Sequence, residues 1–375
     1  MSLAIAGMGW ITPLGRGVDS VWQQLLEGRE GSPATISEKL GPHECIAFRV
    51  PETALGNLAH PRLRRASAIS RFAAAAALDA LNAAGLNVSS QNSNRIGLVF
   101  AVSNGGVIYT RRFYGDIVRS GPQAASPLLF PETVYNAPAS HLAAILGVTG
   151  ATYTLVGDGA VGLAAVKMAE DLVMNETVEQ CLVVGTEEID WLLCDAYRRW
   201  RLLCPRPPME PFGRRPRGMI LSEGAGAILL GKDGPIAVER VHPGAHYDRR
   251  ARAAETLEQI LRDLADDRID FVISSANGTF IDDAECAALR RVLPESAIYT
   301  GKPALGESVG AGGLWQVILG AQALRCSELP PVLHARSDVP LRLSCARSVL
   351  ADARRAIVLN CGVNQQVAGL RLARR

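Results

Sequence analysis

The sequence predicts a layered α/β protein built from two similar halves. Short apolar runs alternate with longer segments of helical periodicity, which is typical of layered α/β folds. One strand end reads AVSNG at residues 101–105, and another reads SSANG at 274–278. Each half also carries a strand, a glycine-rich turn and a helix, at residues 153–166 and 299–319. Similarity over so long a period indicates a duplication within one body.

The first half opens with a short apolar run at residues 3–7, which predicts a strand. Residues 18–26 have apolar side chains at helical spacing and predict an amphipathic helix. An alanine-rich helix is expected at 71–84, ending before Gly85. The continuous apolar run 96–102 predicts a buried strand.

A Pro- and Arg-rich stretch at 204–217 interrupts the pattern later in this half. Around it we predict a helix at 163–174 and strands at 181–185 and 226–230. The second half repeats this outline with a helix at 256–264, a strand at 271–275, a helix at 314–324 and a strand at 356–359. We therefore predict two domains, residues 1–234 and 235–375.

Composition narrows the function classes. The 375 residues are 48% hydrophobic and 20% charged, an ordinary globular balance, with a formal net charge of +2. That charge gives no overall attraction to nucleic acid or to a membrane surface. No apolar run is long enough to predict a membrane span, and we expect no nucleic-acid partner. The eight cysteines are scattered singly, so we expect no metal, no cofactor and a cytoplasmic protein with reduced thiols.

Three segments resemble the β-ketoacyl synthase family. Residues 5–31, IAGMGWITPLGRGVDSVWQQLLEGREG, resemble its opening. Residues 126–146, SPLLFPETVYNAPASHLAAIL, resemble the part that crosses the dimer interface and borders the acyl tunnel. Residues 211–226, PFGRRPRGMILSEGAG, resemble a conserved stretch of the family. The resemblance runs through nearly the whole chain and implies the thiolase-like fold, a duplicated α-β-α-β-α sandwich.

The family condenses acyl chains with malonyl units on acyl carrier protein, using one cysteine and two histidines. The resemblance places Gly159 at the cysteine position, Asn277 at the first histidine and Glu307 at the second. Glycine cannot form an acyl-enzyme, and loss of a nucleophile costs on the order of a million-fold in rate. Asparagine cannot shuttle a proton, and an ionised Glu307 would repel an enolate. The retained Lys302 could instead pair with Glu307.

Two nearby residues admit two interpretations each. Cys361 is either a reactive thiol or a small buried residue at a strand end, and we favour the second. Asp158 is either a new catalytic acid or a residue that caps the following helix or binds local backbone amides; again we favour the second. The C-terminal loop at residues 360–364 also departs from the family's glycine-rich gate.

For a member without its catalytic groups, the resemblance implies a chain-length factor. Such a subunit pairs with an active ketosynthase, completes the acyl tunnel and serves chains carried on acyl carrier protein. The tunnel and dimer interface would then involve Phe113, Leu128, Leu129 and Phe130. Gly159 differs from the glutamine of the aromatic chain-length factors, which favours a polyene system, such as one making aryl polyenes, over an aromatic polyketide system.

A basic patch precedes the alanine-rich helix and comprises Arg62, Arg64 and Arg65. It is either a docking patch for the acidic carrier protein or a solvated surface. Two other functions also stay open. The chain could be a repurposed thioester enzyme that uses Glu307, Asp158 or Cys361, for which a water-accessible pocket joining these groups is required. It could also be a non-catalytic, acyl-binding homodimer.

Overall fold

The computed structural model describes residues 3–375 except 38–42, 57, 59 and 65. Its strands form two sets with the same internal order, β6-β5-β7-β9-β1 and β13-β12-β17-β18-β10. The sets meet where β1 (Leu3–Thr12) pairs with β10 (Ile236–Val241). The structure therefore shows the predicted duplication directly in its sheet topology.

The pairing directions of the two sets also match. In the first set β5 is parallel to both β6 and β7, and the remaining pairs, β7–β9 and β9–β1, are antiparallel. In the second set β12 is parallel to β13 and β17, and β17–β18 and β18–β10 are antiparallel. The bounds are β5 Ile96–Val102, β6 Thr152–Val156, β7 Gln180–Glu187, β9 Gly224–Gly231, β12 Phe271–Ile273, β13 Ala297–Tyr299, β17 Arg355–Cys361 and β18 Gln366–Arg374.

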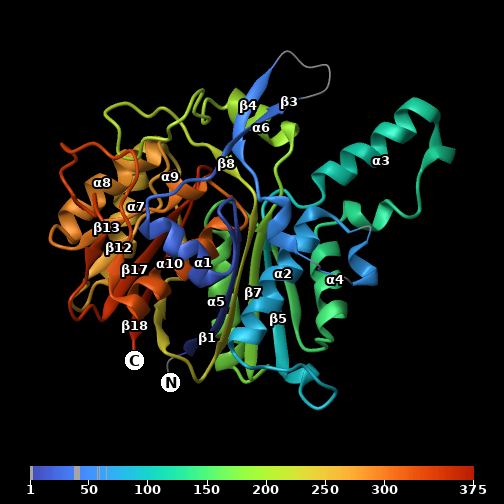
Figure 1. Cartoon of the computed structure of the whole chain (residues 1–375), viewed down its shortest axis with the longest axis horizontal. Helices are drawn as coiled ribbons and strands as arrows, with labels where there is room; N and C mark the ends of the chain where they lie inside the picture. The colour runs from blue at the N-terminus through green and yellow to red at the C-terminus, as the bar shows by residue number, and fades with distance from the viewer. Residues whose placement is uncertain (1–2, 38–42, 57, 59, 65) are drawn as a thin grey trace.

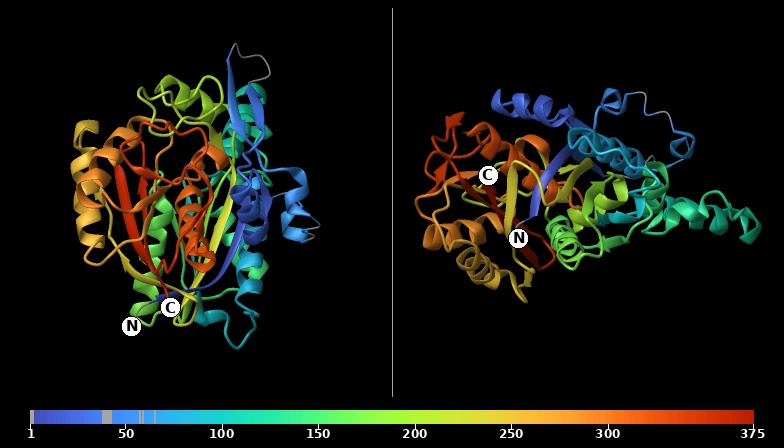
Figure 2. Two further views of the ribbon diagram at one scale, coloured as in Figure 1. Left: turned by 60° about the vertical axis from the view of Figure 1, so that its left-hand side comes forward. Right: turned by 90° about the horizontal axis from the view of Figure 1, so that it is seen from below.

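Helices fill the space between the two sets and cover both outer faces (Figure 1). Helices α5 (Val161–Met174) and α10 (Gly312–Cys326) lie in the middle layer and share one apolar core with strands of both sets. Helices α2 (Ala68–Ala83) and α4 (Ala137–Leu146) cover the first set, and α7 (Ala253–Leu264) with α8 (Phe280–Val292) cover the second. The result is the expected α-β-α-β-α sandwich, seen from two further directions in Figure 2.

The central helix α10 shows how sequence produces the middle layer. It is apolar on all sides, and every residue from Gly312 to Leu324 is buried. A helix of that kind belongs inside a protein and not on its surface. Its glycines also permit close approach, since a Cβ on Gly313 would lie 3.0 Å from the Gly162 Cα of α5. The packing of α5 against α10 holds the two sheet sets in a fixed relation, which positions the strand ends described below.

Most predicted elements occur with small shifts of their ends. Helix α1 (Val18–Leu26) and strand β5 have the expected bounds, whereas β1 runs on to Thr12 and α2 begins earlier than predicted, at Ala68. Ser67 caps α2 by accepting a hydrogen bond from the Ser70 amide. The remaining elements are β2 Gly15–Arg16, β3 Pro33–Ser37, β4 Glu44–Phe48, β8 Leu221–Ser222, β11 Ala245–His246, β14 Glu328–Leu329, β15 Arg342–Leu343, β16 Ser348–Val349, α6 Trp191–Arg199 and α9 Lys302–Leu305.

One segment leaves the compact body. Helix α3 (Val107–Ser120) and the turns after it extend outward, as Figures 1 and 2 both show. We call residues 107–136 the arm. It includes two short 3₁₀ helices, η4 (Pro122–Ala124) and η5 (Phe130–Thr133). The other 3₁₀ helices are η1 Glu52–Leu55, η2 Pro61–Leu63, η3 Ser93–Arg95 and η6 Arg250–Arg252. Within the described residues, no helix has the length and apolarity that crossing a membrane requires.

Candidate functional site

Four strand ends bring the predicted site residues together. Gly159 lies between β6 and α5, and Asn277 lies between β12 and α8. Glu307 follows β13 and the short helix α9, and Cys361 is the last residue of β17. The carboxyl ends of strands are the usual location of ligand sites in open α/β sheets. The duplication places these ends around one centre from both halves.

The centre is held by a buried hydrogen-bonded ion pair. Lys302 Nζ lies 2.6 and 2.5 Å from the two carboxylate oxygens of Glu307, and both residues are 5% exposed. Asn277 Nδ2 donates to Glu307 Oε2 at 2.7 Å, while Asn277 Oδ1 accepts from the hydroxyl of Thr279 at 2.7 Å. Gly306, with a φ of +79°, permits the turn that directs Glu307 inward. Asn277 and Glu307, which the resemblance aligns with the family's two histidines, therefore bond to each other, and Glu307 also binds Lys302.

Two further carboxyl groups stabilise the backbone around Asn277. Asp282 accepts hydrogen bonds from the amides of Phe212 and Asn277 at 2.7 and 2.8 Å. Glu285 accepts from the Ser275 amide and hydroxyl at 3.1 and 2.9 Å. Burial raises the pKa of each carboxyl to about 7. Sequence analysis missed both, although two acids on the apolar face of α8 were a signal that they are enclosed and hydrogen-bonded.

Asp158 fastens the turn before α5 to the C-terminal loop. Its carboxylate accepts from the Gly159 amide at 2.7 Å and from the Asn364 amide at 2.6 Å. The Asp158 amide donates to Gln366 Oε1 at 3.0 Å. The loop passes so close that a Cβ on Gly362 would lie 1.9 Å from Asp158 Oδ2. Burial raises the pKa of Asp158, and these amide donors oppose that rise. Asp158 therefore binds local backbone amides, one of the two roles we favoured, and makes no side-chain cap on α5.

The space left at the centre is very small. The cavity among these groups measures about 10 Å³, roughly the space that one water needs. Its walls are Asp158, Gly159, Met219, Asn277, Glu307, Val309, Cys361, Gly362 and Val363. The structure brings Gly159, Asn277 and Glu307 around one point, as the sequence predicted, but the point is filled. A repurposed thioester enzyme needs an accessible pocket here, and that pocket is absent among the described residues.

Gly159 itself is not crowded. A Cβ at this position would meet Gly362 Cα at 3.4 Å and Asn360 Oδ1 at 3.5 Å, which are ordinary contacts. Both side-chain polar atoms of the buried Asn360 lack a hydrogen-bond partner. The backbone therefore has room for the start of a side chain at the position that the resemblance aligns with the family's nucleophile.

Cys361 lies in an environment that does not favour a reactive thiol. It is 2% exposed, and burial together with nearby carboxylates raises the pKa of its thiol well above the usual value. A thiol kept protonated and away from solvent is a poor nucleophile. The buried-residue interpretation of Cys361 fits this environment.

The predicted interface residues on the arm differ in how exposed their side chains are. Leu128 and Phe130 are exposed, 72% and 57%, and Leu129 is partly buried. Phe113 points into the arm itself, where its ring packs 5.6 Å from that of Phe130. In the predicted basic patch Arg62 and Arg64 are exposed, and Arg65 lies outside the described residues.

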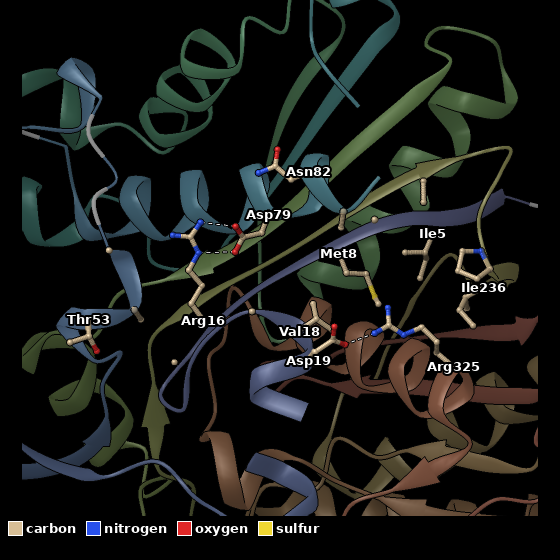
Figure 3. A pocket seen from close by; sticks show the side chains of 18 residues that line it. Ile5, Met8, Arg16, Val18, Asp19, Thr53, Asp79, Asn82, Ile236 and Arg325 are labelled. Atoms are coloured by element: carbon tan, nitrogen blue, oxygen red, sulfur yellow. Dashed lines mark hydrogen bonds and ion pairs between the residues drawn. The ribbon is translucent and has the colours of Figure 1, made fainter. Parts of the chain in front are cut away.

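Larger hollows lie outside the filled centre. A cleft of about 510 Å³, which we call the Tyr197 cleft, opens beside the Asp158 turn. Its walls are Ser103, Asn104, Val156, Gly157, Asp158, Leu193, Ala196, Tyr197, Trp200, His246, Val363, Asn364, Gln365 and Gln366. A hollow of about 910 Å³ lies between α2, β1 and the end of α10 (Figure 3). Its charged groups neutralise each other in the pairs Arg16–Asp79 and Asp19–Arg325. No group of acidic, histidine or cysteine side chains among the described residues is arranged to hold a metal.

Fold and site together define a thiolase-like ketosynthase fold whose strand ends converge on a filled centre. Residues 2–234 match the family Beta-ketoacyl synthase, N-terminal domain, and residues 236–336 match Beta-ketoacyl synthase, C-terminal domain. The chain therefore belongs to the β-ketoacyl synthase family. It is 23% identical to 3-oxoacyl-[acyl-carrier-protein] synthase 2 of Coxiella burnetii over 88% of each chain. It is 24% identical to Nodulation protein E of Rhizobium sp. over 90% of each.

Solved structures share the whole fold. The ishigamide ketosynthase/chain length factor superposes with a TM-score of 0.88 at 23% identity, covering 100% of this chain and 99% of that one. The ketosynthase ApeO in complex with its chain length factor ApeC, from Xenorhabdus doucetiae, gives a TM-score of 0.85 at 19% identity, with coverage of 100% and 98%. These likenesses establish the fold.

Proposed function

We propose that this chain is a non-catalytic ketosynthase-like subunit, a chain-length factor, that pairs with an active β-ketoacyl synthase. The observation that carries the proposal is the filled centre. Asn277, Lys302 and Glu307 use their hydrogen-bonding groups on one another, and Gly159 offers no nucleophile. Such a centre can neither hold an acyl group covalently nor stabilise an enolate. A role in acyl-chain synthesis then requires a second subunit that supplies the chemistry.

The outside of the molecule offers a surface for that subunit. Strand β6 is the last strand of its set, and Tyr153 and Val156 on it are about half exposed. Helix α4 packs against both β6 and η5, so this edge and the arm lie on one side of the body. An unpaired strand edge with apolar side chains is a site for pairing with another chain. Leu128 and Phe130 extend the apolar surface along the arm.

The proposed role follows from this geometry. The arm would contact the ketosynthase, and Leu128, Leu129 and Phe130 would form part of a shared acyl tunnel, with Phe113 supporting Phe130 from behind. The bulk of these side chains would set where the growing chain stops. Structures with the same fold include ketosynthase complexes with a chain length factor and with an acyl-carrier protein, which supports this type of partner. The exposed Arg62 and Arg64 are the proposed carrier-protein contact, and a polyketide or aryl polyene is the proposed product class.

The test is co-expression with an intact ketosynthase encoded beside this chain, followed by size-exclusion chromatography and elongation with carrier protein and malonyl units. We expect a one-to-one complex that elongates, and no elongation by this chain alone. A stable homodimer that ignores the ketosynthase contradicts the proposal and favours the acyl-binding homodimer.

A further inference from the structure

The returning limb of the arm is tied to the body by a hydrogen-bonded pair. Glu132, in η5, places Oε1 2.6 Å from Nε2 of His141, on α4. A carboxylate only accepts hydrogen bonds, so the imidazole donates. Helix α4 belongs to the body, because its residues Ala139, Leu142 and Leu146 are buried in one core with α2. The pair therefore connects the position of η5 to the body of the molecule.

The pair is well placed to hold that connection. The side chains of His141 and Glu132 are 24% and 10% exposed, so both are largely shielded from water. A hydrogen bond to a charged group is stronger than one between neutral groups, and shielding from water strengthens it further. The contact therefore differs from the exposed ion pairs of the surface, which contribute little.

The same turn is also bound to α3. Thr110 on α3 donates its hydroxyl to the carbonyl of Thr133 at 3.2 Å, and the Thr133 hydroxyl donates to the carbonyl of Phe130 at 2.7 Å. At the base of the arm a Cβ on Gly106 would lie only 2.3 Å from the carbonyl oxygen of Glu132. The turn η5 is therefore held by α3 on one side and by α4, through the His141 side chain, on the other.

The proposed tunnel residues lie directly before this pair. Leu128, Leu129 and Phe130 precede Glu132 by two to four positions in the chain. Leu128 and Phe130 are mostly exposed, and exposed side chains contribute little to holding a turn in place. Their position relative to the body therefore depends on contacts made by their neighbours, and Glu132 makes one of these contacts.

We propose that the Glu132–His141 pair is a positioning contact that fixes η5 on the body and thereby sets the depth at which Leu129 and Phe130 end the acyl tunnel. This inference rests on the proposed function for the existence of the tunnel and adds the contact that determines its length. Without the pair, η5 would stay attached to α3 but would shift with the arm relative to α4. The growing chain would then meet the end of the tunnel at more than one depth.

The experiment compares two substitutions of the histidine. His141→Leu removes the donor, whereas His141→Gln keeps a side-chain N–H that can donate to Glu132. Hydrogen-exchange mass spectrometry of the 126–136 peptide, with the chain in whichever assembly it forms, follows the amides of Leu129, Phe130 and Glu132, which donate within the turn. We expect about tenfold faster exchange in His141→Leu, the size of one charged hydrogen bond, and slow exchange in His141→Gln.

A matched control and a second variant isolate the hydrogen bond. His334→Leu removes a histidine that lies at the same 2.6 Å from a carboxylate, that of Glu30, in a part of the chain away from the arm. It should leave the 126–136 peptide unchanged. Glu132→Ala removes the acceptor without altering α4, and should loosen the peptide as His141→Leu does, even where the latter folds poorly.

The same variants are then assayed in the complex with the ketosynthase. We expect His141→Leu to lose the single dominant product length and His141→Gln to retain it. Unchanged exchange in both His141→Leu and Glu132→Ala would overturn the inference, and so would loosening that His334→Leu reproduces. If no complex forms or elongates, the proposed function fails. If the complex elongates to one unchanged length while the peptide exchanges faster, only the positioning role fails.

Discussion

The buried centre and the projecting arm differ in whether their side chains find partners within the chain. At the centre, Asn277, Lys302 and Glu307 are enclosed and bond to one another. On the arm, Val118 and Leu128 are 84% and 72% exposed, and the described residues leave them uncovered. The polar side chains of Asn277, Lys302 and Glu307 already have partners, whereas the arm has apolar surface that remains to be buried. This contrast supports the proposed role, in which the function lies at the surface of the chain.

The same contrast predicts opposite responses to substitution. Changing the centre should alter the free energy of unfolding and leave association unchanged, because its contacts are internal. Changing the arm should alter association and leave unfolding unchanged, because its side chains make few contacts within the chain.

Breaking the central ion pair should have the largest effect. Lys302→Met leaves Glu307 buried without its cation and should reduce the free energy of unfolding by about 3–5 kcal/mol. Urea unfolding followed by circular dichroism measures the change. The double variant Lys302→Met with Glu307→Leu removes both charges and should recover most of the loss. Equal instability of the single and double variants would show that the ion pair is not what holds the centre.

The second effect concerns pH and the carboxyls beside Asn277. Burial raises the pKa of Glu285 to about 7 in the folded chain, so the folded state keeps this proton to a higher pH than the unfolded state. The stability from this group is therefore present below about pH 4.5 and falls as pH rises through 7, by roughly 3 kcal/mol at most. Glu285→Gln should flatten the dependence of unfolding free energy on pH over that window. An unchanged slope would mean that Glu285 is ionised throughout.

The third effect tests the arm. Leu128→Asp should weaken association with the ketosynthase about 30-fold, the cost expected for an interface anchor, and change the free energy of unfolding by less than about 0.5 kcal/mol. Val349→Asp is the matched control, since Val349 is 75% exposed on β16 in the other half of the chain. Equal association of both variants with the ketosynthase would remove the arm from the interface.

The smallest effect concerns the C-terminal loop beside the centre. Asp158→Ala removes the acceptor that binds the Asn364 amide, so the loop should open more often and this amide should exchange about tenfold faster. Hydrogen-exchange mass spectrometry of the 362–366 peptide measures it. Asp116→Ala, on the arm, should leave that peptide unchanged. Slow exchange in both variants would show that the loop is held by other contacts.

The fold and the family could be predicted from sequence because both rest on local patterns. The apolar run of β5 and the helical spacing of α1 appear in the structure with unchanged bounds. The convergence of Gly159, Asn277 and Glu307 followed from the motifs that carry the resemblance to the family. Such motifs fix strand ends and turns, and the fold then brings those ends to one centre.

Other features depend on contacts between segments far apart in the chain, and sequence reasoning missed them. The filling of the centre depends on Asp158 meeting Asn364, some 206 positions away. The Tyr197 cleft arises where α6 meets the C-terminal loop, and nothing near Tyr197 in sequence indicates it. The projection of α3 also follows from how the arm leaves the body and not from its own composition.

The most direct test of the account is the length of the product made by the complex. The complex with the ketosynthase is assayed with carrier protein and malonyl units, and the products of Leu128→Trp, Leu129→Trp and the unchanged chain are compared by mass spectrometry. We expect shorter products from Leu128→Trp and Leu129→Trp than from the unchanged chain, because the larger side chains would fill part of the tunnel. This chain should contribute no nucleophile at any stage. Products of unchanged length from every variant of a well-formed complex would contradict the claim that this chain sets product length from its surface.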